Sequence, residues 1–166
     1  MNKSCILDWE AAKKWREDAG QHGKRIVFTN GVFDILHAGH LDTLEKARAL
    51  GDALILGLNS DKSVQNIKGP LRPIVDEQNR AALLCGLDAV DLVVLFDEDT
   101  PLRLLENLKP DILVKGGDYT PDSVVGKEIV EAGGGRVEII PLVEGLSTTN
   151  VVETVLERYC EKRKSF

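Results

Sequence analysis

The sequence predicts an α/β protein with a doubly wound parallel sheet, folded as one domain over residues 1–166. Three observations lead to this prediction. Short apolar runs alternate with segments of helical periodicity along the whole chain. The apolar runs are nearly continuous rather than alternating, which is typical of parallel strands covered on both faces. A length of 166 residues, with 43% hydrophobic and 29% charged residues, suits one domain that buries its own core.

Apolar spacing defines the elements of the first half of the chain. Trp9, Ala12 and Trp15 recur at helical spacing and predict a lead-in helix. We place this helix within residues 1–22 and expect both tryptophans to pack against the sheet. The elements expected next are a strand at 26–28, a helix carrying Leu41, Leu44, Ala47 and Leu50, a strand at 52–59, a polar loop at 62–76, a helix at 77–87 and a strand at 91–96.

Helix caps and glycine turns define the second half. Asp99-Thr100-Pro101 predicts a helix start, because an acid and an early proline both favour the first turn, and Pro110 ends that helix. The elements expected after it are a strand at 111–114, a helix at 121–132, a glycine turn at 133–135, a strand at 136–140 and a C-terminal helix at 147–162. Strands thus alternate with helices, which predicts parallel pairing through right-handed crossovers.

The most informative motif joins the first strand to the helix after it. Residues 30–40 read NGVFDILHAGH and bring His37 and His40 to the expected helix start, with Gly39 between them. Helix N-termini attract phosphate through unpaired N–H groups and the helix dipole, and imidazoles donate hydrogen bonds to phosphate oxygens. One alternative is a capped helix with two surface histidines. A zinc site is another, but it lacks a third ligand, since His22 is the only other histidine.

Residues 31–40 resemble the GxFDxxHxGH signature of the nucleotidyltransferases related to cytidylyltransferases and to pantetheine-phosphate adenylyltransferase. The resemblance implies a Rossmann-like nucleotidyltransferase fold and catalytic roles for His37 and His40. It also implies that Asp34 contacts the second substrate. The signature positions implied to bind the nucleotide are Gly31, Val32, Phe33, Gly39 and His40.

Further candidates follow two other predicted strands. Lys115-Gly116-Gly117 comes directly after the strand at 111–114, where a cation and unhindered N–H groups can bind phosphates. An ordinary glycine turn is the alternative. In the resemblance, Lys115 occupies the position of a basic residue that contacts the nucleotide phosphates, and it is counted as catalytic. The remaining nucleotide-binding candidates near strand ends are Asn59, Gly117 and Asp118.

Hydroxyl side chains open the expected C-terminal helix at Ser147, Thr148 and Thr149. A helix cap needs only one such side chain, and a simple cap is the alternative reading. The segment resembles the family's ST-rich motif, in which hydroxyls and helix amides hold the nucleotide phosphates. We therefore assign all three residues to nucleotide binding.

Three cations are expected near the second substrate. Lys68 and Arg72 lie in the polar loop at 62–76, which forms either a flap over a polyanion or a solvated linker. In the resemblance, this loop lies between the nucleotide and a sugar phosphate. Arg80 either clamps a phosphate through two hydrogen bonds or pairs with an acid on the surface.

Charge and cysteine content limit the partners. A net charge of −6 and a pI near 5.1 argue against binding to nucleic acid or to anionic membranes. Cys5, Cys85 and Cys160 are widely spaced and are expected to be free thiols in a reducing cytoplasm. The chain start does not resemble a signal peptide, and no apolar run approaches the roughly 20 residues of a membrane span. We expect a cytoplasmic homodimer or higher homo-oligomer that acts on small molecules.

The chemistry implied by these groups needs no nucleophilic side chain. The sequence contains no Walker A loop, no GxGxxG fingerprint and no recognisable base beside a serine or cysteine. A phosphomonoester that attacks the α-phosphorus of a nucleoside triphosphate is already an anion at neutral pH. Positioning and charge neutralisation then suffice for catalysis, with Mg²⁺ held mainly by the nucleotide phosphates.

Residues 24–155 resemble most closely the adenylyltransferase half of bifunctional heptose kinase/adenylyltransferases, with Val32 at a position where those enzymes often have cysteine. The resemblance implies transfer of AMP from ATP to D-glycero-D-manno-heptose 1-phosphate, giving ADP-heptose and pyrophosphate for lipopolysaccharide or surface-glycan precursors. One rival is a CTP-dependent enzyme acting on glycerol 3-phosphate or another small phosphoalcohol. A rival from a different class is a nucleotide-binding regulatory module without turnover.

Overall fold

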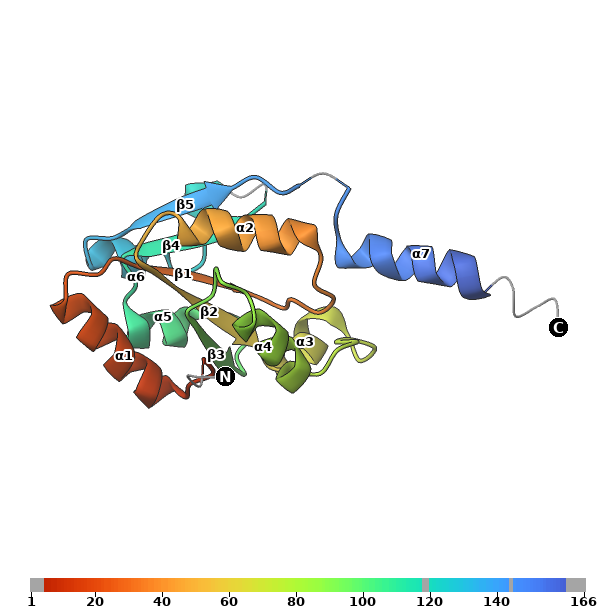
Figure 1. The fold of residues 1–166 in the computed structure, drawn as a ribbon, viewed down its shortest axis with the longest axis horizontal. Helices are drawn as coiled ribbons and strands as arrows, with labels where there is room; N and C mark the ends of the chain where they lie inside the picture. The colour runs from red at the N-terminus through yellow and green to blue at the C-terminus, as the bar shows by residue number, and fades with distance from the viewer. Residues whose placement is uncertain (1–4, 118–119, 144, 161–166) are drawn as a thin grey trace.

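The computed structural model describes residues 5–117, 120–143 and 145–160, which form a five-stranded sheet between two layers of helices (Figure 1). The strand order is β3-β2-β1-β4-β5, and all neighbouring strands are parallel. The strands are β1 (Ile26–Gly31), β2 (Ala53–Asn59), β3 (Leu92–Phe96), β4 (Ile112–Gly116) and β5 (Arg136–Ile140). The predicted doubly wound parallel sheet is therefore confirmed.

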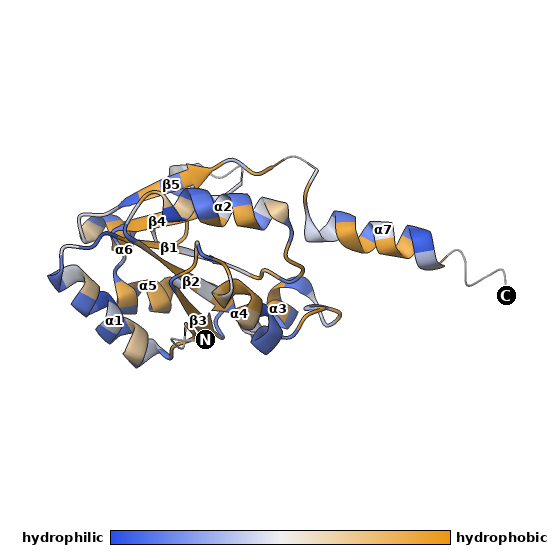
Figure 2. Ribbon diagram, viewed as in Figure 1, coloured by the Kyte–Doolittle hydropathy of each residue, from blue (hydrophilic) through white to orange (hydrophobic). Residues whose placement is uncertain are grey.

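Helices cover both faces of this sheet. The helices on one face are α1 (Trp9–Gln21), α5 (Leu102–Leu108) and α6 (Lys127–Ala132), and those on the other face are α2 (Ala38–Arg48) and α4 (Glu77–Cys85). Of the strands between them, β2 and β3 are almost wholly apolar, whereas the edge strand β5 also carries Arg136 and Glu138 (Figure 2). Successive residues alternate between the two cores, as the pleat requires, with Phe28 in the core under α1 and Val27 in the core under α2. Trp9 and Trp15 pack against the first of these cores, as predicted.

Three aspartates fix the register at the edge where the strands begin. Asp52, Asp91 and Asp111 each precede a strand and accept a backbone N–H at the start of the neighbouring strand. The bonds are Arg25 N to Asp52 at 2.7 Å, Leu54 N to Asp91 at 2.8 Å and Ile26 N to Asp111 at 2.7 Å. Hydrogen bonds to ionised acceptors are strong, and a register slip would break all three. The aspartates at this edge therefore stabilise the strand pairing.

The opposite edge contains the point at which the strand order reverses. β1 pairs with β2 from Ile26 to Gly31, but with β4 only at Val27 and Phe28. The two central strands therefore lack further pairing towards their carboxyl ends. Open α/β sheets bind ligands outside the carboxyl ends of strands at such a reversal.

Two predicted segments are wrong. Residues 62–76 are not one loop, because α3 (Asp61–Lys68) occupies the first half, capped by the Ser60 side chain, which accepts the Ser63 N–H at 3.2 Å. The polar composition of α3 concealed it. The helix expected at 121–132 is broken into a short 3₁₀ turn (Pro121–Ser123) and α6. Gly126 separates them in the left-handed region at φ 92°, where a Cβ would lie 2.2 Å from Leu105.

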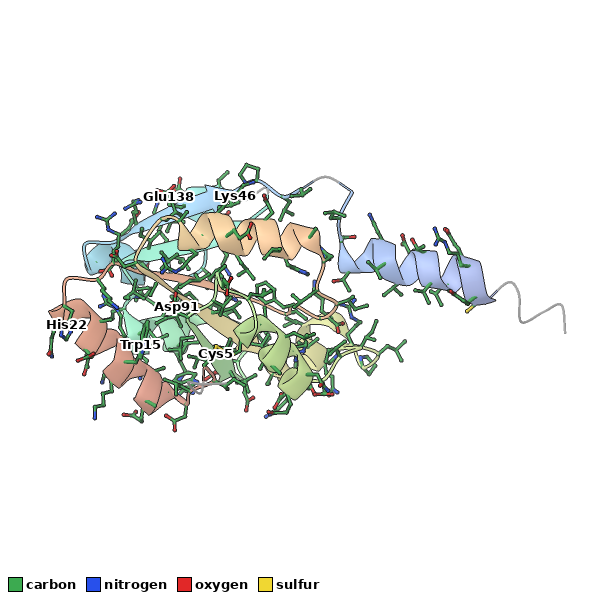
Figure 3. The ribbon with its side chains drawn as sticks, in the orientation of Figure 1. Cys5, Trp15, His22, Lys46, Asp91 and Glu138 are labelled. Atoms are coloured by element: carbon green, nitrogen blue, oxygen red, sulfur yellow. A yellow bond between two sulfur atoms is a disulfide. The ribbon has the colours of Figure 1, made fainter. Side chains whose placement is uncertain are left out.

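The C-terminal helix α7 (Thr148–Cys160) meets the body at its first turn and then extends away from it (Figures 1 and 3). None of its residues, all of which the structure describes, is buried. Val155, Leu156 and Tyr159 of its predicted apolar face are exposed. No helix in the described part of the chain combines the length and apolar character needed to cross a membrane.

The expectation of three free cysteines is wrong. Cys5 and Cys85 form a disulfide between the N-terminal segment and the end of α4 (Cys5 is labelled in Figure 3). Their Cα atoms are 5.7 Å apart, although 80 positions separate them in the sequence. The N-terminal segment runs beside β3, where the Val93 N–H donates to the Cys5 carbonyl at 2.8 Å, and this pairing brings the thiols together. Cys160 is free and exposed.

Candidate active site

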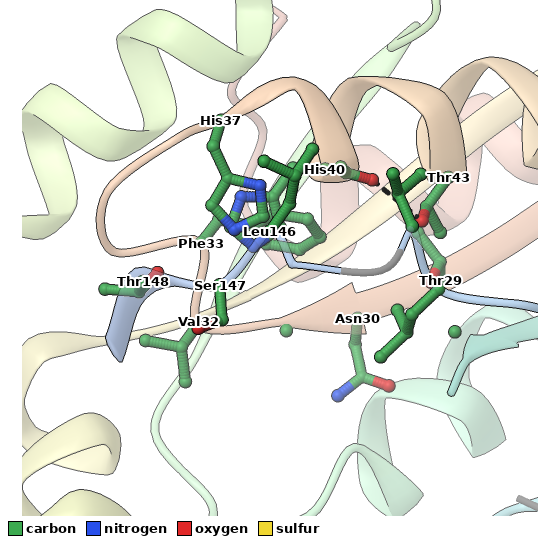
Figure 4. A pocket seen from close by; sticks show the side chains of 15 residues that line it. Thr29, Asn30, Val32, Phe33, His37, His40, Thr43, Leu146, Ser147 and Thr148 are labelled. Carbon is green, nitrogen blue, oxygen red and sulfur yellow. Dashed lines mark hydrogen bonds between the residues drawn. The ribbon is translucent and has the colours of Figure 1, made fainter. Parts of the chain in front are cut away.

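A cavity of about 300 Å³ lies at the carboxyl ends of β1 and β4 (Figure 4). Its walls are the end of β1 with the following loop, the first turns of α2, the end of β4, and residues 142–143 and 146–148. The polar side chains that line it are Thr29, Asn30, His37, His40, Thr43, Ser147 and Thr148. No aspartate or glutamate of the described residues is among them. The described lining therefore offers an anion hydrogen-bond partners and no carboxylate.

His37 and His40 form a stacked pair in this cavity (Figure 4). Their ring centroids are 3.9 Å apart, with 22° between the ring planes. The Phe33 ring also contacts His40, at a centroid distance of 5.2 Å. His37 is the N-cap residue of α2, yet its side chain makes no capping hydrogen bond. The capped-helix alternative therefore does not describe what the His37 side chain does.

The two imidazoles have unsatisfied polar atoms. Nδ1 of His37 and Nδ1 of His40 are buried and have no hydrogen-bond partner in the described structure. A buried polar atom without a partner costs about 1–3 kcal/mol, and such atoms in a native structure are often found at functional sites. Burial, and secondly the neighbouring His37, lower the pKa of His40 to about 4. His40 is therefore neutral at pH 7, with one donor and one acceptor nitrogen.

Gly39 allows the histidines and the segment before α7 to approach each other. A Cβ at this position would lie 3.1 Å from the His37 ring and 3.2 Å from Cβ of Leu146. Gly39 lines the cavity, as do Gly31, Val32 and Phe33. The structure thus brings the predicted nucleotide-binding positions of the signature to one cavity.

Lys115 does not itself line the cavity, but it bonds to a residue that does. Its ammonium donates a hydrogen bond to Oδ1 of Asn30, which lines the cavity beside Gly116. Burial lowers the pKa of Lys115 to about 8, so the side chain is charged at pH 7 and titrates close to neutrality. Gly117 differs from expectation, because its N–H donates to the Ile140 carbonyl at 3.0 Å and is not free for phosphate. Asp118 lies outside the described residues.

The hydroxyl segment divides into different roles. Ser147 and Thr148 line the cavity, while the Thr149 side chain is exposed and does not. Ser147 Oγ accepts the Asn150 N–H at 3.0 Å, so the serine caps α7 as well as lining the cavity. Thr148 Oγ1 is 3.4 Å from the Ile35 carbonyl, a weak contact. The cap reading therefore holds for Ser147, and Thr149 is not positioned as predicted.

Asp34 is buried beneath the signature loop rather than exposed to a substrate. Its side chain is fully enclosed and pairs with Nε of Arg72. The same carboxylate accepts the Ile74 N–H at 2.8 Å and the Val75 N–H at 2.9 Å. Asp34 thus holds the loop at 69–76 in place. Asp34 and Arg72 pair with each other, so neither is placed as the predicted substrate contact. Lys68 ends α3, is exposed and does not line the cavity.

Arg80 fits neither predicted role. It is fully buried, so the surface pairing is wrong. Its guanidinium donates to protein acceptors only, namely the Val75 carbonyl at 2.9 Å, the Val32 carbonyl at 2.6 Å, the Asn59 carbonyl at 2.9 Å and the Asp61 carboxylate at 2.6 Å. These bonds leave no fork free for a phosphate. Asn59 is likewise internal, since its amide donates to Ser63 Oγ at 2.9 Å.

Sequence reasoning missed several residues of the cavity. Asn30 stands inside the quoted motif but received no role of its own, and Thr43 lies one turn after His40 on α2. Helical spacing from His40 could have indicated Thr43. Leu142, Val143 and Leu146 also line the cavity, and no local signal distinguishes them from ordinary exposed apolar residues.

The described residues do not form a metal-binding cluster of three or more histidine, cysteine, aspartate or glutamate side chains. The cavity offers hydroxyl, amide and imidazole groups, whereas Mg²⁺ is bound through carboxylates, waters and substrate phosphates. This donor set fits an ion that is carried on nucleotide phosphates, and it does not fit a magnesium cage made of protein side chains.

Fold and cavity together define a Rossmann-like α/β protein of the nucleotidyltransferase type, with its ligand site at the reversal of strand order. The chain belongs to the cytidylyltransferase-like family, which residues 28–154 match.

Relatives agree with this assignment. The chain is 62% identical over 139 residues to the bifunctional protein HldE of Syntrophotalea carbinolica, covering 84% of this chain and 28% of that protein. It is 64% identical over 137 residues to HldE of Pelobacter propionicus, covering 82% and 28%. A solved structure of the lipopolysaccharide core biosynthesis protein from Thermoplasma volcanium has a TM-score of 0.60 and 34% identity, covering 73% of this chain and 98% of that one. The chain thus spans less than a third of the length of these HldE relatives.

Proposed function

We propose that this chain transfers AMP from ATP to D-glycero-D-manno-heptose 1-phosphate, giving ADP-heptose and pyrophosphate. The observation that carries the proposal is the stacked pair of His37 and His40, whose two buried Nδ1 atoms lack partners among the described residues, beside a cavity whose described lining contains no carboxylate. Such a site is suited to phosphate groups. It is unsuited to a mechanism that needs an acidic side chain as a general base.

The proposed step is a direct displacement at phosphorus. A phosphate oxygen of the sugar phosphate attacks the α-phosphorus of ATP, and the bond from that phosphorus to the bridging oxygen of the departing pyrophosphate breaks. No proton has to be removed, because the attacking oxygen is already ionised. His37 and His40 donate hydrogen bonds to the transferred group, and the Lys115 ammonium offsets the charge that develops there.

Mg²⁺ is the proposed cofactor and enters with the nucleotide. When bound, it neutralises charge on the β- and γ-phosphates and so stabilises the leaving group. The residues of the cavity then orient the complex through hydrogen bonds, with Ser147 and the first amides of α7 as further donors to phosphate. Gly39 allows a ligand to approach the helix mouth closely.

The choice of substrates rests on the relatives and on the motifs. The matched relatives are bifunctional HldE proteins, and the chain corresponds in its motifs to the adenylyltransferase half of bifunctional heptose kinase/adenylyltransferases. The solved relative is a lipopolysaccharide core biosynthesis protein. ADP-heptose would accordingly serve the synthesis of lipopolysaccharide or another surface glycan.

Pyrophosphate release against a grid of nucleotides and phosphomonoesters tests the proposal. We expect release with ATP and D-glycero-D-manno-heptose 1-phosphate, in the presence of Mg²⁺. Release with CTP and glycerol 3-phosphate instead would support the cytidylyltransferase rival. Nucleotide binding without release against any acceptor would support the regulatory module.

We also propose that the protein acts in the cytoplasm, where ATP is available. The cysteines give no support to this location, because Cys5 and Cys85 are joined in a disulfide, a bond that is rare in cytosolic proteins. The proposal therefore rests on the substrate. Fractionation of cells that express the full chain, followed by immunodetection, is the direct test.

A homodimer or higher oligomer is the proposed assembly, with α7 in the contact. An isolated helix of this length is marginal in water, and none of the described residues of α7 is buried. Its apolar residues Val155, Leu156 and Tyr159 are exposed, as are Leu142, Val143 and Leu146 before it, and a second copy would have these apolar side chains to cover. Sedimentation of the wild type and of Leu156→Glu should show a larger species that the variant loses. A monomeric wild type would contradict the proposal.

A further inference from the structure

Two buried charged side chains lie beside the cavity without lining it. Asp34 is 3% exposed and Arg80 is fully buried, and both were expected to contact substrate. Burying a charge is costly unless hydrogen bonds satisfy it. Several of the hydrogen bonds that these two residues make go to the same short backbone segment, which indicates that the pair holds this segment in place.

Both side chains hold the same peptide segment of the loop at 69–76. Asp34 accepts the Val75 N–H at 2.9 Å, while Arg80 donates to the Val75 carbonyl at 2.9 Å. The loop is thereby held on both sides of Val75. Arg80 also donates to the Val32 carbonyl at 2.6 Å, so one guanidinium joins this loop to the signature loop.

The residue between these anchors has an unusual backbone. Phe33 lies in the left-handed region at φ 47°, a conformation that is unfavourable for a residue other than glycine. The Val32 carbonyl belongs to the same peptide unit as the Phe33 nitrogen, so the direction of that carbonyl and the φ angle of Phe33 are coupled. Arg80 fixes this peptide unit from one side, and the buried Asp34 side chain fixes the next residue. Strain of this kind persists only where the surroundings enforce it.

The left-handed turn directs the Phe33 ring towards the histidines. Its centroid lies 5.2 Å from that of His40, and His40 in turn stacks on His37 at 3.9 Å. Gly31 leaves room for the ring, since a Cβ there would lie 2.9 Å from it. Contacts therefore run without a break from Arg80, through the Val32 peptide and the Phe33 ring, to the two imidazoles (Figure 4 shows the last part of this path).

We propose that Arg80 and Asp34 are positioning residues of the transfer site, which hold Phe33 in its left-handed conformation and thereby fix the stacked arrangement of His40 and His37. This inference rests on the proposed function for its consequence in catalysis. Neither residue touches the substrates. Each acts through the Val32–Asp34 backbone, and the loop at 69–76 is the element that the two share.

Arg80→Lys is the first test, because lysine keeps the charge but cannot make the set of bonds that the guanidinium fork makes. The probe is the NMR titration of the ring protons of His40 in the protein without ligands. In the wild type, burial keeps the pKa of His40 at about 4. The groups that face this ring are His37 and the uncharged Phe33. Release of Phe33 should admit water and raise the pKa of His40 towards 6.5, by one unit or more.

In Arg80→Lys, kcat should fall about 10- to 100-fold, because misplacing catalytic groups by about 1 Å can cost about 100-fold in rate. The KM for ATP should change by less than about threefold. Asp34→Asn is the second variant and should show the same changes to a smaller degree. Asparagine keeps one oxygen acceptor for the N–H groups of Ile74 and Val75. This variant also decides the matter if Arg80→Lys does not fold.

Leu108→Ala is the matched control, since it destabilises the buried core on the opposite face of the sheet. It should lower the melting temperature while leaving the His40 titration and kcat unchanged. A folded Arg80→Lys or Asp34→Asn variant with a wild-type His40 titration would overturn the inference. If the wild type transferred no nucleotide to any acceptor, the proposed function would fail, and the titrations would still decide whether these residues position the histidines.

Discussion

The wall of the cavity that carries His37 and His40 is anchored deep in the protein, whereas the wall formed by residues 142–143 and 146–148 is attached at the surface. Behind the first wall, Phe33 and Asp34 are buried, and α2 is fixed through its buried residues Leu44 and Ala47. In the second wall, Leu142 is 60% exposed and Leu146 is 41% exposed. The chain then continues into α7, of which no described residue is buried.

This difference indicates how the site divides its work. Groups that stabilise a transition state must be fixed before the reaction, and the histidine wall meets that requirement. Groups that only contact a ligand can become ordered when the ligand or a partner subunit binds. The second wall is of this kind, because its residues Leu142 and Leu146 are exposed. We therefore expect substitutions in the first wall to change kcat and substitutions in the second to change KM.

The largest expected effect is at the histidines. His37→Ala and His40→Ala should each lower kcat by about 100-fold or more, on the scale of losing one preorganised donor, while circular dichroism shows the fold intact. Steady-state pyrophosphate release measures the change. His22→Ala is the control, because His22 is exposed at the end of α1 and its replacement should leave kcat unchanged. A rise in the KM for ATP without loss of kcat would make the pair simple ground-state binders.

Lys115 should set the alkaline limit of the reaction. Its pKa is lowered by burial to about 8, so the ammonium is present below that pH and is lost as the pH rises through it. The kcat/KM of the wild type should therefore fall above about pH 8. In Lys115→Arg the charge persists, since arginine does not deprotonate in proteins, and the alkaline limb should move to higher pH even if the maximum is lower. Superimposable limbs in the two proteins would assign the titration to another group.

Ser147→Ala tests the second wall. It removes the oxygen that caps α7 and should weaken the helix start by about 1 kcal/mol, which corresponds to an increase of about fivefold in the KM for ATP. The kcat should change by less than about twofold. Thr149→Ala is the companion variant, because its side chain is exposed outside the cavity. An equal rise in the KM for ATP in both variants would indicate that Thr149 also binds the nucleotide.

The smallest effect is expected at Lys68, the exposed last residue of α3. Lys68→Ala should raise the KM for the sugar phosphate a few-fold, since exposed ion contacts are worth about 1 kcal/mol or less, and should leave calorimetric binding of ATP unchanged. Lys62→Ala, also exposed on α3, is the matched control. Equal losses for both substrates would assign Lys68 to the nucleotide, and no loss for either would make α3 and its loop a solvated connection.

Much of the fold could be predicted because its signals are local. Continuous apolar runs give the strands, since both faces of a parallel sheet are covered, and helical spacing gives most helices. α3 was missed because its polar sequence buries only Ser63 and Val64. The helix at 121–132 was predicted too long because the left-handed conformation of Gly126 is forced by contact with Leu105, a residue from another helix.

The site shows the same division between local and distant information. Motif spacing and strand direction are local properties, so they were enough to predict that two histidines, a strand-end lysine and a hydroxyl-rich helix start would meet at one edge of the sheet. The partners of the buried charges could not be predicted in this way. Asp34 finds Arg72 38 positions away, and Arg80 finds the Val32 carbonyl 48 positions away. Cys5 meets Cys85 for the same reason. The residue type of a charged side chain does not reveal whether it binds a ligand or a backbone carbonyl. Its burial decides between the two, and burial depends on elements that pack over the side chain from elsewhere in the chain.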